Sequence, residues 1–155
     1  MDYDLSLLLK FFHVLGAVVW VGGMFFAYMA LRPAAGEALE PPQRLRLWSG
    51  TLRRFFNWVW FAVALLLASG FYLTYQLGGL NAPAYVYFMM AIGIVMMLIF
   101  AHVFFAPFKR LKRGVASQDW KIAGAALNQI RILVAANLFL GLIVIATATL
   151  GKAGL

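Results

Sequence analysis

The chain contains no cysteine among its 155 residues. This absence excludes disulfide bonds, thiolate metal sites and thiol chemistry, so histidine, methionine, tyrosine and carboxylates are the side chains left to bind a metal. Acidic residues are also scarce. Only five are present, and all lie outside the apolar segments: Asp2, Asp4, Glu37, Glu40 and Asp119. An acidic proton relay within a membrane is therefore disfavoured.

Charge is scarce as a whole, because charged residues make up 12% of the chain and hydrophobic residues 65%. Soluble domains carry about 25% charged residues, so the composition is that of a membrane protein in a lipid bilayer. The net charge is +8, but the basic residues cluster beside apolar segments, where membrane topology accounts for them. We therefore expect no nucleic acid partner.

Four long apolar segments span about residues 11–31, 55–75, 84–106 and 132–150. A helix of about 20 residues rises roughly 30 Å, the thickness of the hydrocarbon core of a bilayer. The sequence thus predicts an all-α fold: one domain, 1–155, built as an up-and-down bundle of four transmembrane helices. We expect a lead-in over residues 1–10, an end of the first helix at Arg32-Pro33, and a short separate interfacial helix after Pro42. An amphipathic stretch over 119–127 is expected to begin the last helix.

The basic residues predict the orientation of the bundle. Eleven of the 13 lysines and arginines lie between the first and second or between the third and fourth segments, and the other two are Lys10 and Lys152. Because cytoplasmic loops are rich in lysine and arginine, both basic loops are predicted to be cytoplasmic and both termini periplasmic. The chain is expected to lie in a bacterial inner membrane and to cross it several times.

His13 is the first residue with potential chemistry, near the outer end of the first segment. Its helical stripe continues through small and apolar residues: Gly16, Trp20, Gly23, Met24 and Ala27. Small residues such as the Gly23-x-x-x-Ala27 pair let helices pack closely. His13 is therefore expected to face a neighbouring helix, and a homo-oligomer is expected. Two interpretations stay open. His13 is either an interfacial residue bonded to a carbonyl or water, or a ligand to haem iron or copper.

Further ligands are available at the depth of His13. Met89 and Met90 lie at the outer end of the third segment, and each is followed by another methionine seven residues later. A thioether opposite a histidine is a known haem ligation, and thioethers with a histidine suit Cu(I), with Met24 as a further copper candidate. Flexible packing of the core is the alternative role for these methionines.

His102 lies near the inner end of the third segment. Its depth differs from that of His13 by roughly 20 Å, so the two cannot bind one haem within a subunit. At this end a basic pocket for a propionate, a porphyrin carboxylate or a lipid headgroup is possible, with interfacial anchoring as the alternative. Its candidate members are His102, Arg131, Asn128, Gln129, Arg53, Arg54 and Asn57.

The run His13-x6-Trp20-x-x-Gly23 resembles the first-helix signature of the copper-resistance protein D (CopD) family and of its relative, the HemJ-type protoporphyrinogen oxidase. His102, the basic run after it, and Arg131 before an apolar last helix are similar to the HemJ type. This resemblance implies a haem b protein with the first-helix histidine as ligand, or copper tolerance or passage. Ile132-Leu133-Val134 after Arg131 differs from the HemJ pattern, so haem binding is implied more strongly than protoporphyrinogen oxidation.

Three functions follow as hypotheses. The first is a CopD/HemJ-like protein that binds haem b through His13 and has a redox or electron-transfer role, with Trp20, Gly23, Met89, Met90, His102 and Arg131 as further cofactor-site candidates. The second is copper handling by His13 with Met24, Met89 or Met90. The third is an accessory subunit of a larger membrane complex. A redox partner is expected under the first, and the sequence leaves open whether the protein is an enzyme.

Overall fold

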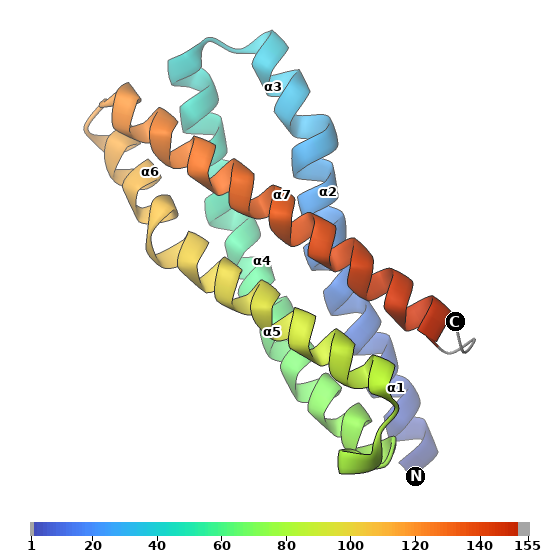
Figure 1. The fold of residues 1–155 in the computed structure, drawn as a ribbon. Coiled ribbons are helices and arrows are strands. Elements are labelled where there is room, and N and C mark those ends of the chain that lie inside the picture. The colour runs from blue at the N-terminus through green and yellow to red at the C-terminus, as the bar shows by residue number, and fades with distance from the viewer. Residues whose placement is uncertain (1, 152–155) are drawn as a thin grey trace.

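A computed structural model describes residues 2–151, and nearly all of them are helical. Met1 and residues 152–155, which include the Lys152 counted above, lie outside the described residues. Four helices of the described part are long and apolar enough to cross a membrane: Tyr3–Ala38, Pro41–Gln76, Ala84–Ala116 and Trp120–Leu150. They run alternately up and down (Figure 1). The predicted all-α bundle of four membrane helices is confirmed.

The first membrane helix is longer than expected at both ends. α1 (Asp2–Ala17) includes most of the lead-in and continues without a break as far as α3 (Arg32–Ala38). The prediction that this helix ends at Arg32-Pro33 is therefore wrong. Pro33 is the second residue of α3, and only Arg32 separates it from a π-helical segment that ends at Leu31. A π-helical turn shifts the backbone hydrogen bonds from the fourth to the fifth preceding residue, so a proline just after it disturbs the helix less.

Two π-helical segments, η1 (Val18–Gly22) and η2 (Ala27–Leu31), flank the short α2 (Gly23–Phe26). Gly16, Trp20 and Met24 are buried and recur every four residues. In an α-helix of 3.6 residues per turn, a four-residue repeat drifts by about 40° per turn. A π-turn contains more residues and absorbs this drift. The wide turn of η1, which lies between Gly16 and Met24, thus keeps the Trp20 and Met24 side chains directed into the bundle.

The second membrane helix, α4 (Pro41–Gln76), is a single helix of 36 residues. The separate interfacial helix predicted after Pro42 is therefore wrong, because that segment is the first part of α4. Its buried residues Leu45, Trp48 and Leu52 continue at helical spacing into Phe56 and further along the membrane span. An unbroken apolar stripe favours one helix, and a capping box formed by Glu40 and Gln43 fixes its start.

The remaining helices follow after the short η3 (Gly79–Asn81). α5 (Ala84–Phe105) matches the third predicted span, and α6 (Pro107–Ala116) follows a bend at Ala106. α7 (Trp120–Leu150) begins in the amphipathic stretch as expected. The Asp119 side chain caps α7 by accepting a hydrogen bond from the backbone N–H of Ile122 at 3.0 Å.

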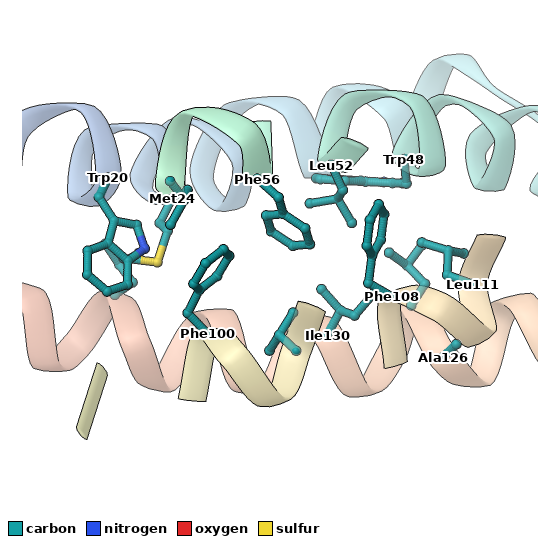
Figure 2. Packing of buried hydrophobic residues seen from close by; sticks show 14 of the residues in the cluster. Trp20, Met24, Trp48, Leu52, Phe56, Phe100, Phe108, Leu111, Ala126 and Ile130 are labelled. Carbon is teal, nitrogen blue, oxygen red and sulfur yellow. The ribbon is translucent and has the colours of Figure 1, made fainter. Parts of the chain in front are cut away.

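The bundle consists of two packed groups, since α1 lies along α4, whereas α7 lies along α5 and α6. Aromatic rings join the two groups (Figure 2). The Phe56 ring of α4 meets the rings of Phe100 in α5 and Phe108 in α6, with centroids 5.4 and 4.9 Å apart. These edge-on contacts are the favoured geometry for aromatic pairs, and they form the centre of the hydrophobic core.

The core occupies only one half of the bundle. We call residues 18–63 and 96–138 the arginine half. These residues contain the whole hydrophobic core cluster and both basic loops. We call residues 3–17, 64–95 and 139–151 the His13 half. Its buried residues are all small: Gly16, Ser69, Ala82 and Gly141. Figure 1 shows the α3–α4 and α6–α7 connections together, at the end opposite to the N-terminus.

Candidate functional site

His13 is half-buried where α1 packs against α4. Its Nδ1 lies 2.8 Å from Oγ of Ser69, which is 1% exposed. Glycines permit this close approach. A Cβ atom added to Gly70 would lie 3.3 Å from Cε1 of His13, and one added to Gly16 would lie 3.2 Å from Cγ of Leu66. The predicted small-residue face of the first helix therefore brings His13 against a neighbouring helix.

The partner of Ser69 determines the tautomer of His13. The Ser69 hydroxyl donates to the backbone carbonyl of Leu65, with an oxygen–oxygen distance of 2.5 Å. A hydroxyl has one hydrogen, and a carbonyl oxygen only accepts. Ser69 Oγ must therefore accept the hydrogen bond from His13, and we assign the ring proton to Nδ1. The Nε2 atom then carries the lone pair that a metal ion would bind.

This pair has the form of a supported metal ligand. A histidine that binds a metal usually donates its other ring N–H to a fixed acceptor, which holds the ring in place and makes the ligating nitrogen more basic. Within the described residues, no hydrogen-bond partner is found for Nε2 of His13. The ring is thus anchored at one nitrogen and free at the other.

His102 has none of these features. It lies in the last turn of α5 and its side chain is exposed. Its ring has no hydrogen bond in the described region, and its backbone carbonyl accepts from the N–H of Ala106 at 3.0 Å. The two histidines lie in different halves of the bundle, so the structure does not bring them together. His102 is therefore a natural control for His13.

Trp20, Gly23 and Met24 lie in the core rather than beside His13. Trp20 and Met24 are each 2% exposed, and the Trp20 ring packs edge-on against Phe100 at 6.0 Å. A Cβ atom added to Gly23 would lie 2.2 Å from Cε2 of Phe55, so this glycine makes room for an aromatic ring of α4. Met24 follows His13 by eleven residues on the same helix, about 16 Å along its axis. One metal ion within a subunit cannot reach both.

Met89 and Met90 are half-buried in the second turn of α5. They belong to the same half of the bundle as His13. α5, however, has its main contacts with α7, whereas α1 has its main contacts with α4. The two thioethers therefore belong to the other group of helices, and their role as ligands remains a prediction.

Arg131 belongs to a different set from the one predicted. It lines a cavity of about 740 Å³ in the arginine half, together with Arg32 and Arg44. The other predicted members do not line this cavity. Gln129 instead accepts a hydrogen bond from Arg110, and Arg54 donates to the carbonyl of Gly50 at 3.2 Å. The remaining ones, His102, Asn128, Arg53 and Asn57, are exposed. Helical stripes of single segments did not identify Arg32 and Arg44, because their contribution depends on how α3 and α4 meet α7.

The donor set limits the kind of metal site. Across residues 3–151, no group of three or more His, Cys, Asp or Glu side chains is placed to hold a metal ion. A closed site of nitrogen and oxygen ligands is therefore not built into this part of one subunit. A copper site at His13 would combine one imidazole with thioethers or with ligands of a second copy, a donor set that suits Cu(I).

Comparison with protein families supplies the missing context. Residues 49–150, about two thirds of the chain, match the family described as copper resistance protein D. The chain belongs to this family. The match to the CopD family covers most of α4 and the whole of α5, α6 and α7, and it includes Ser69, Met89, Met90 and Arg131. His13 precedes the matched residues. No curated protein and no solved structure matches the chain.

Proposed function

We propose that this CopD-family membrane protein handles copper, and that Nε2 of His13 binds the ion. The observation that carries the proposal is the Ser69 hydrogen bond, which places the proton on Nδ1 and leaves Nε2 with its lone pair. Imidazole is a good ligand for copper, and the family description names copper resistance. Ser69 acts as a positioning residue, since it holds the ring without touching the ion.

The further ligands of the ion come from soft donors. Met89 and Met90 are the candidates in the same half of the bundle, and thioethers stabilise Cu(I). Met24 is too far along the helix to share an ion with His13 within a subunit. A second copy could supply a further His13 imidazole if the protein forms the homo-oligomer that its small-residue faces favour.

Haem b is the second candidate for His13. It is favoured by the resemblance of the run His13-x6-Trp20-x-x-Gly23 to the HemJ type, because a neutral imidazole is an axial ligand of haem iron. In this case His13 would hold the iron, and the bound haem would supply the redox chemistry for electron transfer. The same tautomer serves both metals, so the choice depends on which of them the protein retains.

We place the protein in a bacterial inner membrane with both termini in the periplasm. Eleven of 13 lysines and arginines lie in the arginine half or at its connections, which the positive-inside rule assigns to the cytoplasmic side. His13 then lies near the periplasmic surface, where it meets copper arriving from outside. A redox partner, or a larger membrane complex, would be contacted through the exposed surface of the bundle.

The test compares the wild-type protein with His13→Ala and His102→Ala, each purified and placed in lipid nanodiscs. We expect at most one bound Cu(I) per His13, measured by competition with a coloured Cu(I) chelator. This binding should be lost in His13→Ala and kept in His102→Ala. An absorption spectrum of the same samples reports haem, because a Soret band lost only in His13→Ala supports the second candidate. Equal metal binding by all three proteins would overturn both. Absence of either metal together with a stable partner on pull-down would support an accessory subunit.

A further inference from the structure

The arginine half contains a second polar site that the copper proposal does not use. Its cavity of about 740 Å³ lies between the end of the first membrane helix, the start of α4 and the first turns of α7. Pockets of about 300–1,000 Å³ are typical of sites for small molecules. The lining residues are Tyr28, Met29, Arg32, Pro33, Gly36, Pro41, Arg44, Leu45, Trp48, Trp120, Gly124, Leu127 and Arg131.

The charge of this cavity is unbalanced. Three arginines line it, Arg32, Arg44 and Arg131, and no Asp or Glu is among the lining residues. In addition, Nε of Arg131 is buried and lacks a hydrogen-bond partner among the described residues. A buried donor without a partner is costly, and converging guanidinium groups repel one another. The repulsion between the guanidinium groups is relieved when an anion occupies the cavity.

The rest of the lining indicates the shape of this anion. Tyr28, Trp48 and Trp120 supply aromatic surface, and the lining also includes aliphatic side chains. The Arg32 guanidinium already lies over the Tyr28 ring, 4.8 Å from its centroid, so this arginine is held in position. A ligand that fits has an anionic head for the arginines and an apolar body for the aromatic wall. This is the chemistry of an amphiphile.

We propose that this cavity binds the phosphate group of an anionic amphiphile, with Arg32, Arg44 and Arg131 as its ligands. A phosphate presents several anionic oxygens in different directions and can accept from three guanidinium forks at once, whereas a carboxylate presents two oxygens in one plane. A phospholipid of the leaflet beside the basic loops is the expected source, because anionic headgroups gather at such clusters. A soluble phosphate compound is the other source.

Gly124 offers a way to close the cavity without disturbing the helices. It lines the cavity from α7, and a Cβ atom added to it would have no neighbour within 4 Å. A leucine side chain at this position therefore extends into the cavity. Because leucine also favours the helix more than glycine does, the Gly124→Leu protein should fold as well as the wild type.

The test measures binding of phosphatidylglycerol to the detergent-purified protein by native mass spectrometry and by the rise in its melting temperature. We expect Arg44→Gln and Arg131→Gln each to weaken binding by about 10-fold or more, as for the loss of a charged hydrogen bond. Gly124→Leu should abolish binding while its melting temperature without lipid stays at the wild-type value or above. The matched control is Arg53→Gln, which removes the same charge from an exposed position of α4 outside the cavity.

Two further measurements identify the source of the phosphate group and test whether the cavity is specific for phosphate. If glycerol 3-phosphate alone protects the protein with the same dependence on Arg44 and Gly124, a soluble phosphate compound is the ligand and the phosphate site stands. If oleate binds as tightly as phosphatidylglycerol, phosphate recognition is refuted. Equal losses in Arg53→Gln and Arg44→Gln would also overturn the proposal, since they would show attraction to surface charge only. His13→Ala should leave all these measurements unchanged, which separates this site from the copper proposal.

Discussion

The two halves of the bundle differ in what holds the helices together. In the arginine half, aromatic side chains from α4, α5 and α6 interlock, and the Phe56 ring alone has partners on two other helices. In the His13 half, the buried residues are small, and the link between α1 and α4 includes the His13–Ser69 hydrogen bond. In lipid, helices associate through close packing and polar contacts rather than through hydrophobicity. One half is thus held by aromatic packing, and the other combines small buried residues with a polar contact between helices.

The largest expected change in stability comes from truncating one aromatic ring in each half. Phe56→Ala should destabilise the bundle by about 3 kcal/mol, the lower end for a buried phenylalanine, because lipid tails already offer an apolar environment to the unfolded helix. Phe71→Ala should have little effect, since Phe71 is 61% exposed in the His13 half. Thermal unfolding followed by fluorescence gives both values. Equal losses would remove the distinction between the halves.

A second comparison uses two adjacent glycines. Gly23→Leu should cost about 2 kcal/mol, because the added side chain collides with Phe55 in a well-packed region. Gly22→Leu is the matched control, since a Cβ atom there meets nothing within 4 Å. Thermal unfolding measures both variants. The double variant Gly23→Leu/Phe55→Ala should recover part of the loss, and full additivity of the two changes would contradict the contact.

The polar link of the His13 half is tested by Ser69→Ala. Loss of a hydrogen bond between membrane helices should cost about 1 kcal/mol in thermal unfolding. Copper affinity should fall about 10- to 100-fold, as expected when the support of a histidine ligand is removed. Thr147→Val is the control, because that hydroxyl bonds only to the carbonyl of Ile143 on its own helix. If Ser69→Ala changes stability and leaves copper affinity at the wild-type value, Ser69 is a packing residue and does not position the ligand.

The smallest effect concerns the boundary between the halves. The buried Asn137 donates to the carbonyl of Met96 at 3.2 Å, while its own Oδ1 atom has no partner among the described residues. Asn137→Leu loses one weak interhelical bond and removes one unsatisfied acceptor. The two contributions oppose each other, so we expect a change below about 0.6 kcal/mol in thermal unfolding. A loss of stability several times larger would show that the Asn137 hydrogen bond is essential for the packing of α5 against α7.

The sequence predicted the elements of the fold well and their ends less well. Four apolar segments identified the membrane helices, because length and hydropathy depend on local composition alone. Pro33 was read as a stop, but the π-helical segment before it removes the usual conflict of a proline with its helix. The π-turns themselves have no clear local signal. The four-residue repeat of Gly16, Trp20 and Met24 becomes meaningful only once all three are known to face the same way.

The packing of His13 was predicted, whereas its partner was not. The small-residue stripe indicated that His13 would pack against a neighbouring helix, and it does so. The partner Ser69 was missed, because it is a lone hydroxyl on α4, and only the pairing of α1 with α4 brings it into contact. Arg32 and Arg44 were missed as cavity residues for the same reason. Contacts between segments distant in the chain follow from the tertiary arrangement, which stripes on individual helices do not contain.

The state of the His13 ring can be measured directly, because the chain contains only two histidines. The protein labelled with ¹⁵N at both histidines is placed in nanodiscs, and its imidazole resonances are recorded with and without Cu(I). We predict that His13 carries its proton on Nδ1 and that its Nε2 resonance alone shifts when Cu(I) is added, while His102 stays unchanged. A His13 ring protonated at Nε2, with Nδ1 accepting from Ser69 and no response to Cu(I), would contradict the proposed metal ligand.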